Sequence, residues 1–593
     1  MEKSRISKIE LWGLIAILIF ALFLRVYNLG NASLWIDESI SSMVSRNILE
    51  KGIPLLDSGM FYGGAYVFHY FQAFFLFFFM NEFGARIFSA LIGVLAVLLA
   101  YFIGREYSKS GGIISALFMS VFFLEVFFSR QARYYQLFQL MFFLSLYLLY
   151  KSKENPKFLY LALVSFFITL DTKIAGIILA PFFILHILLY NRKQWFLSLI
   201  PAFFLVKDFI PASTLSSVSV SSVSSSGLTE ESSNLVRNFA SRYFGYTANM
   251  LYMLILFVPG VLWAFFKKKR LTLLIVLPSL IMLTGIFSLE VFALRYAYFF
   301  AFPLVLYSSL LMSFLYEKFG KILLIAIIAL LIIPSNIFFP LTYVNIIKPI
   351  DYNYNDPSAP WTDYKSLPDN LTVELMSNTT LISLFPSDVE WYLRKPDYVI
   401  PFTMTGQGND QISFNSPGGE VVGRYSGAKI INYSDMPERP YYVTADYFSF
   451  SKLKPSQRED FDKLVIGCEI KYEKTDLRVF SCSAKNKVLR VIDGDTFELE
   501  GGEKVRLICI DTPENGEVGY EEAKQFLAGL IENKTVVLEK DVSDKDVYGR
   551  LLRYVYVNNF EEEVFVNREI VSKGFGEVWP YGNDTAKCDE IDS

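Results

Sequence analysis

Residues 491–514 read VIDGDTFELEGGEKVRLICIDTPE, two strand-like runs joined by Gly501 and Gly502. β-Branched and aromatic residues are frequent in both runs, which is typical of half-buried strands. Acidic, arginine and threonine side chains gather around these runs. The stretch therefore predicts a small sheet that carries a polar site able to attract a cation.

The same strand pattern runs from Val488 to the end of the chain, in short strands interrupted by the helical pattern YEEAKQFLAGLIEN. This arrangement fits a small closed β-barrel of the OB kind. Residues 486–593 hold 13 Lys and Arg against 24 Asp and Glu, a net charge of −11. That charge argues against a nucleic-acid interface built on basic residues. We therefore expect residues 486–593 to form a separate, acidic barrel domain.

Five side chains of this barrel suit one chemistry. Asp495 and Asp511 lie at the ends of neighbouring predicted strands and can converge on one hard cation. Glu514 can reach a water molecule beside that cation, while Arg506 and Arg550 supply two guanidinium groups for a phosphodiester. Carboxylates, an oxygen-bound metal, a base and paired arginines together indicate phosphodiester hydrolysis.

The order VIDGDT, VRLICIDTPE, DVYGRLLRYVYV and VNREIVSKGF resembles the staphylococcal-nuclease-like (thermonuclease) family. The resemblance implies a Ca²⁺-dependent nuclease that acts on DNA or RNA. Its implied residues are Asp495, Asp511 and the Thr512 carbonyl for Ca²⁺, Glu514 as general base, Arg506 and Arg550 for phosphate, and Tyr548 and Asp546 alongside. An inactive barrel that serves as a binding module is the alternative.

The first 345 residues have another character. The whole chain is 53% hydrophobic with 56 Phe, and repeated apolar runs separated by short charged loops lie before Val344. This is the pattern of a polytopic α-helical membrane protein. The run from Tyr66 to Met80 is short for the roughly 30 Å apolar core of a bilayer, so we interpret it as an interfacial or re-entrant segment.

Basic residues at the start of the chain place the N-terminus in the cytoplasm. Basic loops such as Arg192–Lys193 then also lie inside, and everything after residue 345 lies outside, in extracytoplasmic space. The sequence thus predicts about 11 transmembrane helices, near residues 9–28, 86–104, 112–128, 134–150, 158–170, 174–190, 195–210, 248–266, 271–289, 293–316 and 322–344.

Charges at the ends of membrane helices are costly and therefore mark functional candidates. Asp37 and Glu38 follow the first predicted crossing on its outer side, and Arg130, Arg133 and Arg295 lie at outer ends of later crossings. A carboxylate can take the proton of an acceptor hydroxyl while arginines bind a phosphate leaving group. In a membrane, the leaving group would be a lipid phosphate.

The segments LRVYNLG, SLWIDES, GGAYVFHYF, FGARIFSALIGVLAVLLAYFIGREY and SRQARYYQL together resemble GT-C glycosyltransferases, in particular the dolichyl-phosphate-mannose protein mannosyltransferases and the lipid A aminoarabinose transferases. The resemblance implies transfer of a sugar from a polyprenyl phosphate to an external glycan, lipid or protein acceptor, with inversion. Asp37 or Glu38 occupies the family's acidic position. His69 lies near the place of a Lys-Pro-Pro stretch of the aminoarabinose transferases and is assigned to substrate binding. A divalent cation at this site is left open, and membrane lipids are expected partners.

Residues 346–485 alternate short strand and helix patterns and predict a small α/β region. Cys468 and Cys482 flank a hairpin-like segment and would pair in an oxidising space, one of three pairings that four cysteines allow. Cys588 is expected to be reduced. The chain is thus divided into a GT-C-like transmembrane glycosyltransferase (1–345), an extracytoplasmic α/β region (346–485) and a nuclease barrel (486–593). In the alternative, the helices only anchor a surface nuclease.

Overall fold

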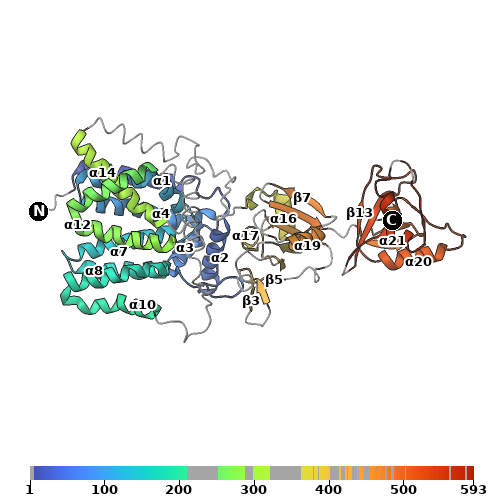
Figure 1. Cartoon of the computed structure of the whole chain (residues 1–593), viewed down its shortest axis with the longest axis horizontal. Coiled ribbons are helices and arrows are strands. Elements are labelled where there is room, and N and C mark those ends of the chain that lie inside the picture. The colour runs from blue at the N-terminus through green and yellow to red at the C-terminus, as the bar shows by residue number, and fades with distance from the viewer. Residues whose placement is uncertain are drawn as a thin grey trace, which may run out of the picture. The chain divides into compact units, whose positions relative to one another are not determined.

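The computed structural model describes residues 6–209, 251–287 and 298–320 and, apart from short gaps, residues 362–400 and 413–592. The chain divides into two compact units, residues 1–56 with 61–361 and residues 57–60 with 362–593. Each unit is described here by itself. Figure 1 shows that helices make up the first unit, whereas the second contains sheets with a few helices.

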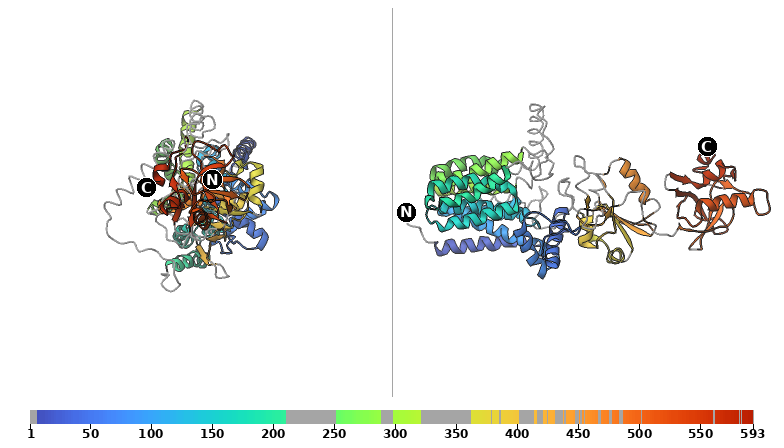
Figure 2. Two further views of the ribbon diagram at one scale, coloured as in Figure 1. Left: turned by 90° about the vertical axis from the view of Figure 1, so that its right-hand side faces the viewer. Right: turned by 90° about the horizontal axis from the view of Figure 1, so that it is seen from below.

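Helices of the first unit lie side by side in one bundle (Figure 2). Their bounds are α1 (Lys8–Val26), α2 (Ile36–Lys51), α3 (Tyr66–Phe78), α4 (Glu82–Arg105), α5 (Lys109–Val121), α6 (Phe123–Ser129), α7 (Tyr135–Lys151), α8 (Lys157–Thr172), η1 (Ile174–Leu179), α9 (Ala180–Tyr190), η2 (Arg192–Ser198), α10 (Leu199–Phe209), α12 (Leu251–Phe287), η4 (Tyr298–Phe300) and α14 (Ala301–Phe319).

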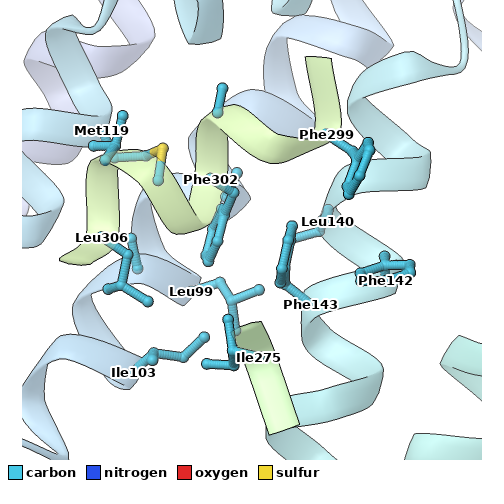
Figure 3. Packing of buried hydrophobic residues seen from close by; sticks show 14 of the residues in the cluster. Leu99, Ile103, Met119, Leu140, Phe142, Phe143, Ile275, Phe299, Phe302 and Leu306 are labelled. Atoms are coloured by element: carbon cyan, nitrogen blue, oxygen red, sulfur yellow. The ribbon is translucent and has the colours of Figure 1, made fainter. Parts of the chain in front are cut away.

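The core of the bundle is aromatic and aliphatic. Phe143 of α7 stacks on Phe302 of α14 with ring centroids 4.5 Å apart. Leu99 of α4 and Ile275 of α12 pack below this pair (Figure 3). Stacked rings of this kind add to the free energy gained from burying apolar surface. This packing joins four helices whose sequences lie far apart.

The described residues contain three segments long and apolar enough to cross a membrane, namely α1, α4 and Tyr298–Phe319. The pair α5 and α6, bent by 59°, is a fourth candidate if it is one broken span. Several other predicted crossings correspond to shorter helices, such as the 17 residues of α7. The crossings at 248–266 and 271–289 fall on the 37-residue element α12, whose helical backbone is broken at Lys268, and the crossing at 322–344 lies outside the described residues. Eleven crossings are therefore not confirmed. The run from Tyr66 forms only the 13-residue helix α3.

Residues 362–482 contain a mixed sheet and short helices, in line with the α/β pattern of the sequence. Eight strands lie in the order β3-β4-β5-β2-β1-β6-β8-β7. The central strand β1 pairs in parallel with β2 and with β6, which is buried along its whole length. The elements are η5 (Tyr364–Ser366), α16 (Asp369–Met376), β1 (Thr380–Ser383), α17 (Pro386–Tyr392), β2 (Tyr398–Val399), β3 (Ser413–Asn415), β4 (Val421–Gly423), β5 (Lys429–Ile430), β6 (Tyr441–Asp446), α19 (Pro455–Val465), β7 (Glu469–Glu473) and β8 (Leu477–Cys482).

The C-terminal strands close into a barrel. The sheet order is β13-β14-β11-β10-β9, with β11 and β14 parallel, and a bridge between Lys487 and Thr535 joins the two edges. The elements are β9 (Val488–Val491), β10 (Thr496–Leu499), β11 (Lys504–Leu507), β12 (Ile510–Asp511), α20 (Tyr520–Ile531), β13 (Val536–Glu539), β14 (Leu551–Asn559), β15 (Glu562–Phe565), α21 (Val566–Ser572), β16 (Glu577–Val578) and α22 (Cys588–Ile591).

The first strand-like run is not continuous. It is broken between β9 and β10 by a tight turn in which the backbone N–H groups of Ile492 and Asp493 both donate to the Thr496 carbonyl. The turn brings Asp495 to the start of β10. In β11 the side chains of Val505 and Leu507 are buried in the barrel, and Arg506 lies between them on the other face.

All four cysteines are in disulfides. The pair Cys468–Cys482, left open by the sequence, is formed. The expectation that Cys588 is reduced is wrong, because it is bonded to Cys509, 79 residues earlier. The closed barrel and α22 bring these two cysteines together, which spacing along the chain does not reveal.

Candidate functional sites

The two carboxylates after α1 have different surroundings. Glu38 is fully buried. Arg86 of α4 donates to it from Nε at 2.9 Å and from Nη2 at 2.7 Å, and the Ala132 backbone N–H donates at 2.6 Å. Arg86 also donates to the carbonyls of Leu29, Ala32 and Ser33. Glu38 is therefore the centre of an ion pair that fixes the loop between α1 and α2.

Asp37, by contrast, keeps 27% of its side chain exposed. Its carboxylate lies 3.8 Å from Nη2 of Arg133 and 3.5 Å from the hydroxyl of Tyr135. Nη1 of Arg133 donates to the Asp37 carbonyl and to Ser41 Oγ, and the guanidinium lies over the rings of Tyr134 and Tyr135. The structure thus places the partly exposed carboxylate of Asp37 beside the guanidinium of Arg133, which is held in position.

The other predicted residues of this site divide into three cases. His69 lies on α3 and is fully buried beside Ser45. Nη1 of Arg130 donates to the carbonyls of Leu24, Arg25 and Tyr27, so this guanidinium caps the C-terminal end of α1. Arg295 lies outside the described residues.

Arg86 was missed by the sequence analysis, although its position held a signal. It is a charge near the start of the apolar stretch FGARIFSALIGVLAVLLAYFIG, and a charge in such a place rarely lacks a partner. Asp171 lies near the end of α8. Its carboxylate accepts from the backbone N–H groups of Tyr66 and Val67 and so caps α3.

In the barrel, the two predicted metal ligands face a single guanidinium. Arg506 pairs with the Asp495 carboxylate, and its Nη2 lies 3.2 Å from Oδ1 of Asp511. Thr512 Oγ1 donates to Asp495 at 3.2 Å. A Cβ atom at Gly494 would lie 2.6 Å from that hydroxyl, so glycine allows the two loops to approach this closely.

The second arginine reaches the same cluster from the position directly before β14. Nη1 of Arg550 lies 3.4 Å from Oγ1 of Thr496, which in turn donates to Asp495 at 2.9 Å. Nε of Arg550 donates to Asp546 at 2.6 Å. Glu514 is exposed on the loop after Thr512. Arg506 therefore contacts Asp495 directly, and Arg550 is linked to it through Thr496.

Tyr548 lies on the turn before Arg550 and is 82% exposed. Its ring packs against the Arg550 guanidinium, with a centroid distance of 5.4 Å. An exposed aromatic ring beside a phosphate-binding arginine can stack on a nucleic-acid base. The role of Tyr548 in substrate binding stays a prediction.

The pKa values of two acids in this cluster shift in opposite directions. It raises the pKa of Asp495 to about 7, and nearby Asp493 acts in the same direction, while Arg506 opposes them. Burial alone would also raise the pKa of Asp546, but hydrogen bonds from Arg550 lower it. Burial disfavours the charged form of a carboxylate. A nearby cation therefore stabilises a buried carboxylate more than an exposed one.

The donor set fits a hard cation such as Ca²⁺. Carboxylate and carbonyl oxygens are the ligands that Ca²⁺ prefers, and the Arg506 guanidinium already lies where one positive charge meets both Asp495 and Asp511. The described residues contain no cluster of three or more Asp, Glu, His or Cys side chains in metal-binding geometry. A site here would thus need two carboxylates and other oxygen ligands.

Comparison with known proteins gives two matches. Residues 64–216 match the family model of dolichyl-phosphate-mannose-protein mannosyltransferases, and residues 504–591 match that of staphylococcal nuclease homologues. Three curated relatives are an uncharacterized protein of Methanocaldococcus jannaschii (35% identical over 121 residues; 16% of this chain, 58% of the relative), protein ParB of Escherichia coli (40% over 77 residues; 12% and 42%) and the thermonuclease of Staphylococcus hyicus (37% over 97 residues; 15% and 55%).

The chain spans about half the length of the curated relatives that it matches. The two family matches fall on the helical unit and on the barrel, the two parts in which the side-chain clusters were found. The chain therefore carries a helical region similar to dolichyl-phosphate-mannose-protein mannosyltransferases and a C-terminal region similar to staphylococcal nuclease homologues.

Proposed function

We propose that the helical unit transfers a sugar from a polyprenyl-phosphate donor to an extracytoplasmic glycan, lipid or protein acceptor, with Asp37 as the general base. The observation that carries this proposal is the contrast between the two neighbouring acids. Glu38 is saturated by Arg86 and backbone donors, whereas the Asp37 carboxylate is partly exposed. Only the second is free to receive a proton.

In the proposed reaction the acceptor hydroxyl attacks the anomeric carbon of the donor sugar and gives its proton to Asp37. The bond between that carbon and the phosphate oxygen breaks, and polyprenyl phosphate leaves with the electron pair. Attack opposite the leaving group inverts the anomeric configuration. These steps balance without a cofactor. The presence of a divalent cation beside the leaving phosphate is left open.

Arg133 is the group that we assign to the leaving phosphate. Its Nη1 is held by Ser41 and the Asp37 carbonyl, and its Nε is buried without an acceptor among the described residues. A prepositioned N–H of this kind stabilises negative charge as it develops. Arg130, which caps α1, would act by holding the start of the loop between α1 and α2 in place. Arg295 stays a proposal from the sequence.

Purified full chain, incubated with a panel of labelled polyprenyl-phosphate sugars and hydroxyl acceptors, tests this function. Transfer should be lost in Asp37→Asn. Because Glu38→Gln breaks a buried ion pair, it should instead lower the stability of the protein. Equal transfer by wild type and Asp37→Asn would refute the assignment of the base.

We propose that the barrel, which we assign to the OB fold from its strand order, hydrolyses phosphodiesters of DNA or RNA. The observation that favours this second activity is that Arg506 and Arg550 lie within one hydrogen-bonded cluster with Asp495, Asp511 and Thr512. Ca²⁺ held by the two aspartates and the Thr512 carbonyl would offset the charge of the bound phosphate and polarise a water molecule.

The chain's own residues supply the remaining steps of that hydrolysis. Glu514 takes a proton from the attacking water, whose oxygen bonds to phosphorus while the P–O bond to one sugar oxygen breaks and that oxygen leaves with the electron pair. The guanidiniums of Arg506 and Arg550 stabilise the charge on the phosphate oxygens. Tyr548 stacks on a neighbouring base. The net charge of −11 in residues 486–593 opposes a polyanion at long range, so we expect weak substrate affinity and a strong dependence on the cation.

Both proposed activities require a non-cytosolic site. Two disulfides in the second unit favour an oxidising compartment, in which such bonds persist. Two readings compete with the bifunctional one. If the helices are only an anchor, the transfer assay gives no product while single-stranded nucleic acid is cut. If the barrel is only a binding module, nucleic acid stays intact with Ca²⁺ present.

A further inference from the structure

His69 lies one turn into α3, where the bundle holds it firmly. Asp171 caps the first turn of this helix, and the His69 backbone N–H donates to the Ala65 carbonyl. The side chain is fully buried, with the rings of Tyr62 and Phe68 packed edge-on against it. The orientation of the imidazole is therefore fixed by its surroundings.

A chain of hydrogen bonds determines which ring nitrogen carries the proton. Gln72 Nε2 donates to the Ala85 carbonyl at 2.9 Å, which can only accept, so the amide oxygen of Gln72 faces Ser45. The Ser45 hydroxyl donates its single proton to that oxygen at 2.7 Å. Its oxygen is then an acceptor for Nδ1 of His69, 3.3 Å away.

The charge beside the ring agrees with a neutral imidazole. Arg133, a cation, lies close enough to act on the ring and disfavours a second proton on it. The imidazole is thus neutral, with an unprotonated Nε2.

This Nε2 atom is buried and has no hydrogen-bond partner among the described residues. A buried acceptor left without a donor is destabilising, so such an atom is expected to receive a donor when the site fills. The nearby cation Arg133 excludes cationic donors from this place. A neutral hydroxyl is the chemical group that fits.

We propose that Nε2 of His69 accepts a hydrogen bond from a hydroxyl group of a substrate of the transferase site. The inference rests on the proposed glycosyl transfer and deepens it, because it adds a residue that orients a sugar or acceptor hydroxyl beside Asp37 and Arg133. Ser45 and Gln72 act through His69 as positioning residues. The hydroxyl belongs either to the donor sugar or to the acceptor.

The tautomer can be tested without turnover. The chain has two histidines, so the full-length protein with ¹⁵N-labelled histidine gives two sets of ring signals, and His186→Asn assigns them. We expect His69 to carry its proton on Nδ1 and its free Nε2 signal to move when polyprenyl-phosphate mannose or an acceptor is added. A proton on Nε2, or a hydrogen bond to Nε2 before any ligand is added, would overturn the inference.

Kinetics identify the hydroxyl. In His69→Asn, which keeps a donor near Ser45 but has no atom at Nε2, KM for one substrate should rise about tenfold with kcat nearly unchanged. The matched control is His186→Asn, because His186 is also buried but pairs with Ser152; it should leave KM unchanged.

Deoxy analogues separate the two sources. Removing the contacted hydroxyl from the donor or from the acceptor should slow wild type about tenfold and leave His69→Asn unaffected. Equal penalties in both proteins would overturn the role of His69 while leaving glycosyl transfer intact. If wild type binds and transfers none of the panel, the proposed function itself fails and the inference falls with it.

Discussion

The disulfide Cys509–Cys588 should hold the proposed nuclease site together. Cys509 directly precedes β12, which carries Asp511, and it adopts a positive φ of 61°, an uncommon conformation for a residue other than glycine. The bond spans a sequence separation of 79, and closing a loop of that size corresponds to about 4.5 kcal/mol at 25 °C in the chain-entropy account. The total stability of a small domain is roughly 5–15 kcal/mol.

Cys509→Ser with Cys588→Ser should therefore lower the unfolding free energy of the barrel by about 4 kcal/mol. Part of the contact surface remains, because the Tyr554 hydroxyl and the Asp541 carboxylate still accept from the backbone of the segment before α22. We expect the barrel to stay folded in buffer, with weaker nuclease activity because β12 loses its support.

Pulse proteolysis of the full chain in a urea series, read through a C-terminal tag, measures this change. The matched control is Cys468→Ser with Cys482→Ser, which removes a bond of separation 14 that lies outside the barrel. This control should leave the barrel midpoint in place. A barrel midpoint that Cys509→Ser with Cys588→Ser shifts by less than about 1 kcal/mol would refute the reasoning.

Three further predictions concern the two sites. Asp37→Asn should abolish transfer with little change in thermal stability, whereas Glu38→Gln, by leaving Arg86 buried without its counter-ion, should destabilise the bundle by about 3–5 kcal/mol; thermal unfolding in detergent separates the two, and the reverse pattern would exchange their roles. Glu514→Gln should slow cleavage of single-stranded DNA by a factor of about 10²–10⁴, and unchanged cleavage would reject it as the base. Chelation of Ca²⁺ should stop cleavage reversibly and Asp511→Asn should raise the Ca²⁺ concentration needed; activity that persists in chelator would remove the metal from the account.

The sequence predicted that Asp495 and Asp511 converge, and the structure brings both to Arg506; their part in hydrolysis stays a prediction. Asp495, Arg506 and Asp511 are separated by single turns, and local strand pattern is enough to bring them together. Arg550 lies directly before β14, far along the chain, and no local pattern brings it to this cluster. The pairing of Cys509 with Cys588 depends on barrel closure, which no local pattern contains.

In the helical unit, hydropathy and charge predicted where helices occur better than they predicted how many segments are long enough to cross a membrane. Apolar composition does not show where a helix breaks, as it does between α5 and α6 at Phe122, so continuous runs were counted as spans. The sequence also could not choose between Asp37 and Glu38, which are adjacent. The structure distinguishes the two acids, because Arg86 of α4 forms an ion pair with Glu38.

The compartment of the barrel is the central claim, because lipid-linked transfer and the disulfides both depend on it. All native cysteines are oxidised, so Val518→Cys, at a fully exposed position, gives the chain a single thiol. Lys193→Cys, exposed in a loop predicted to be cytosolic, is the matched control. We predict that a membrane-impermeant maleimide labels Val518→Cys in intact cells and Lys193→Cys only after lysis; labelling of Val518→Cys that requires lysis would contradict the account.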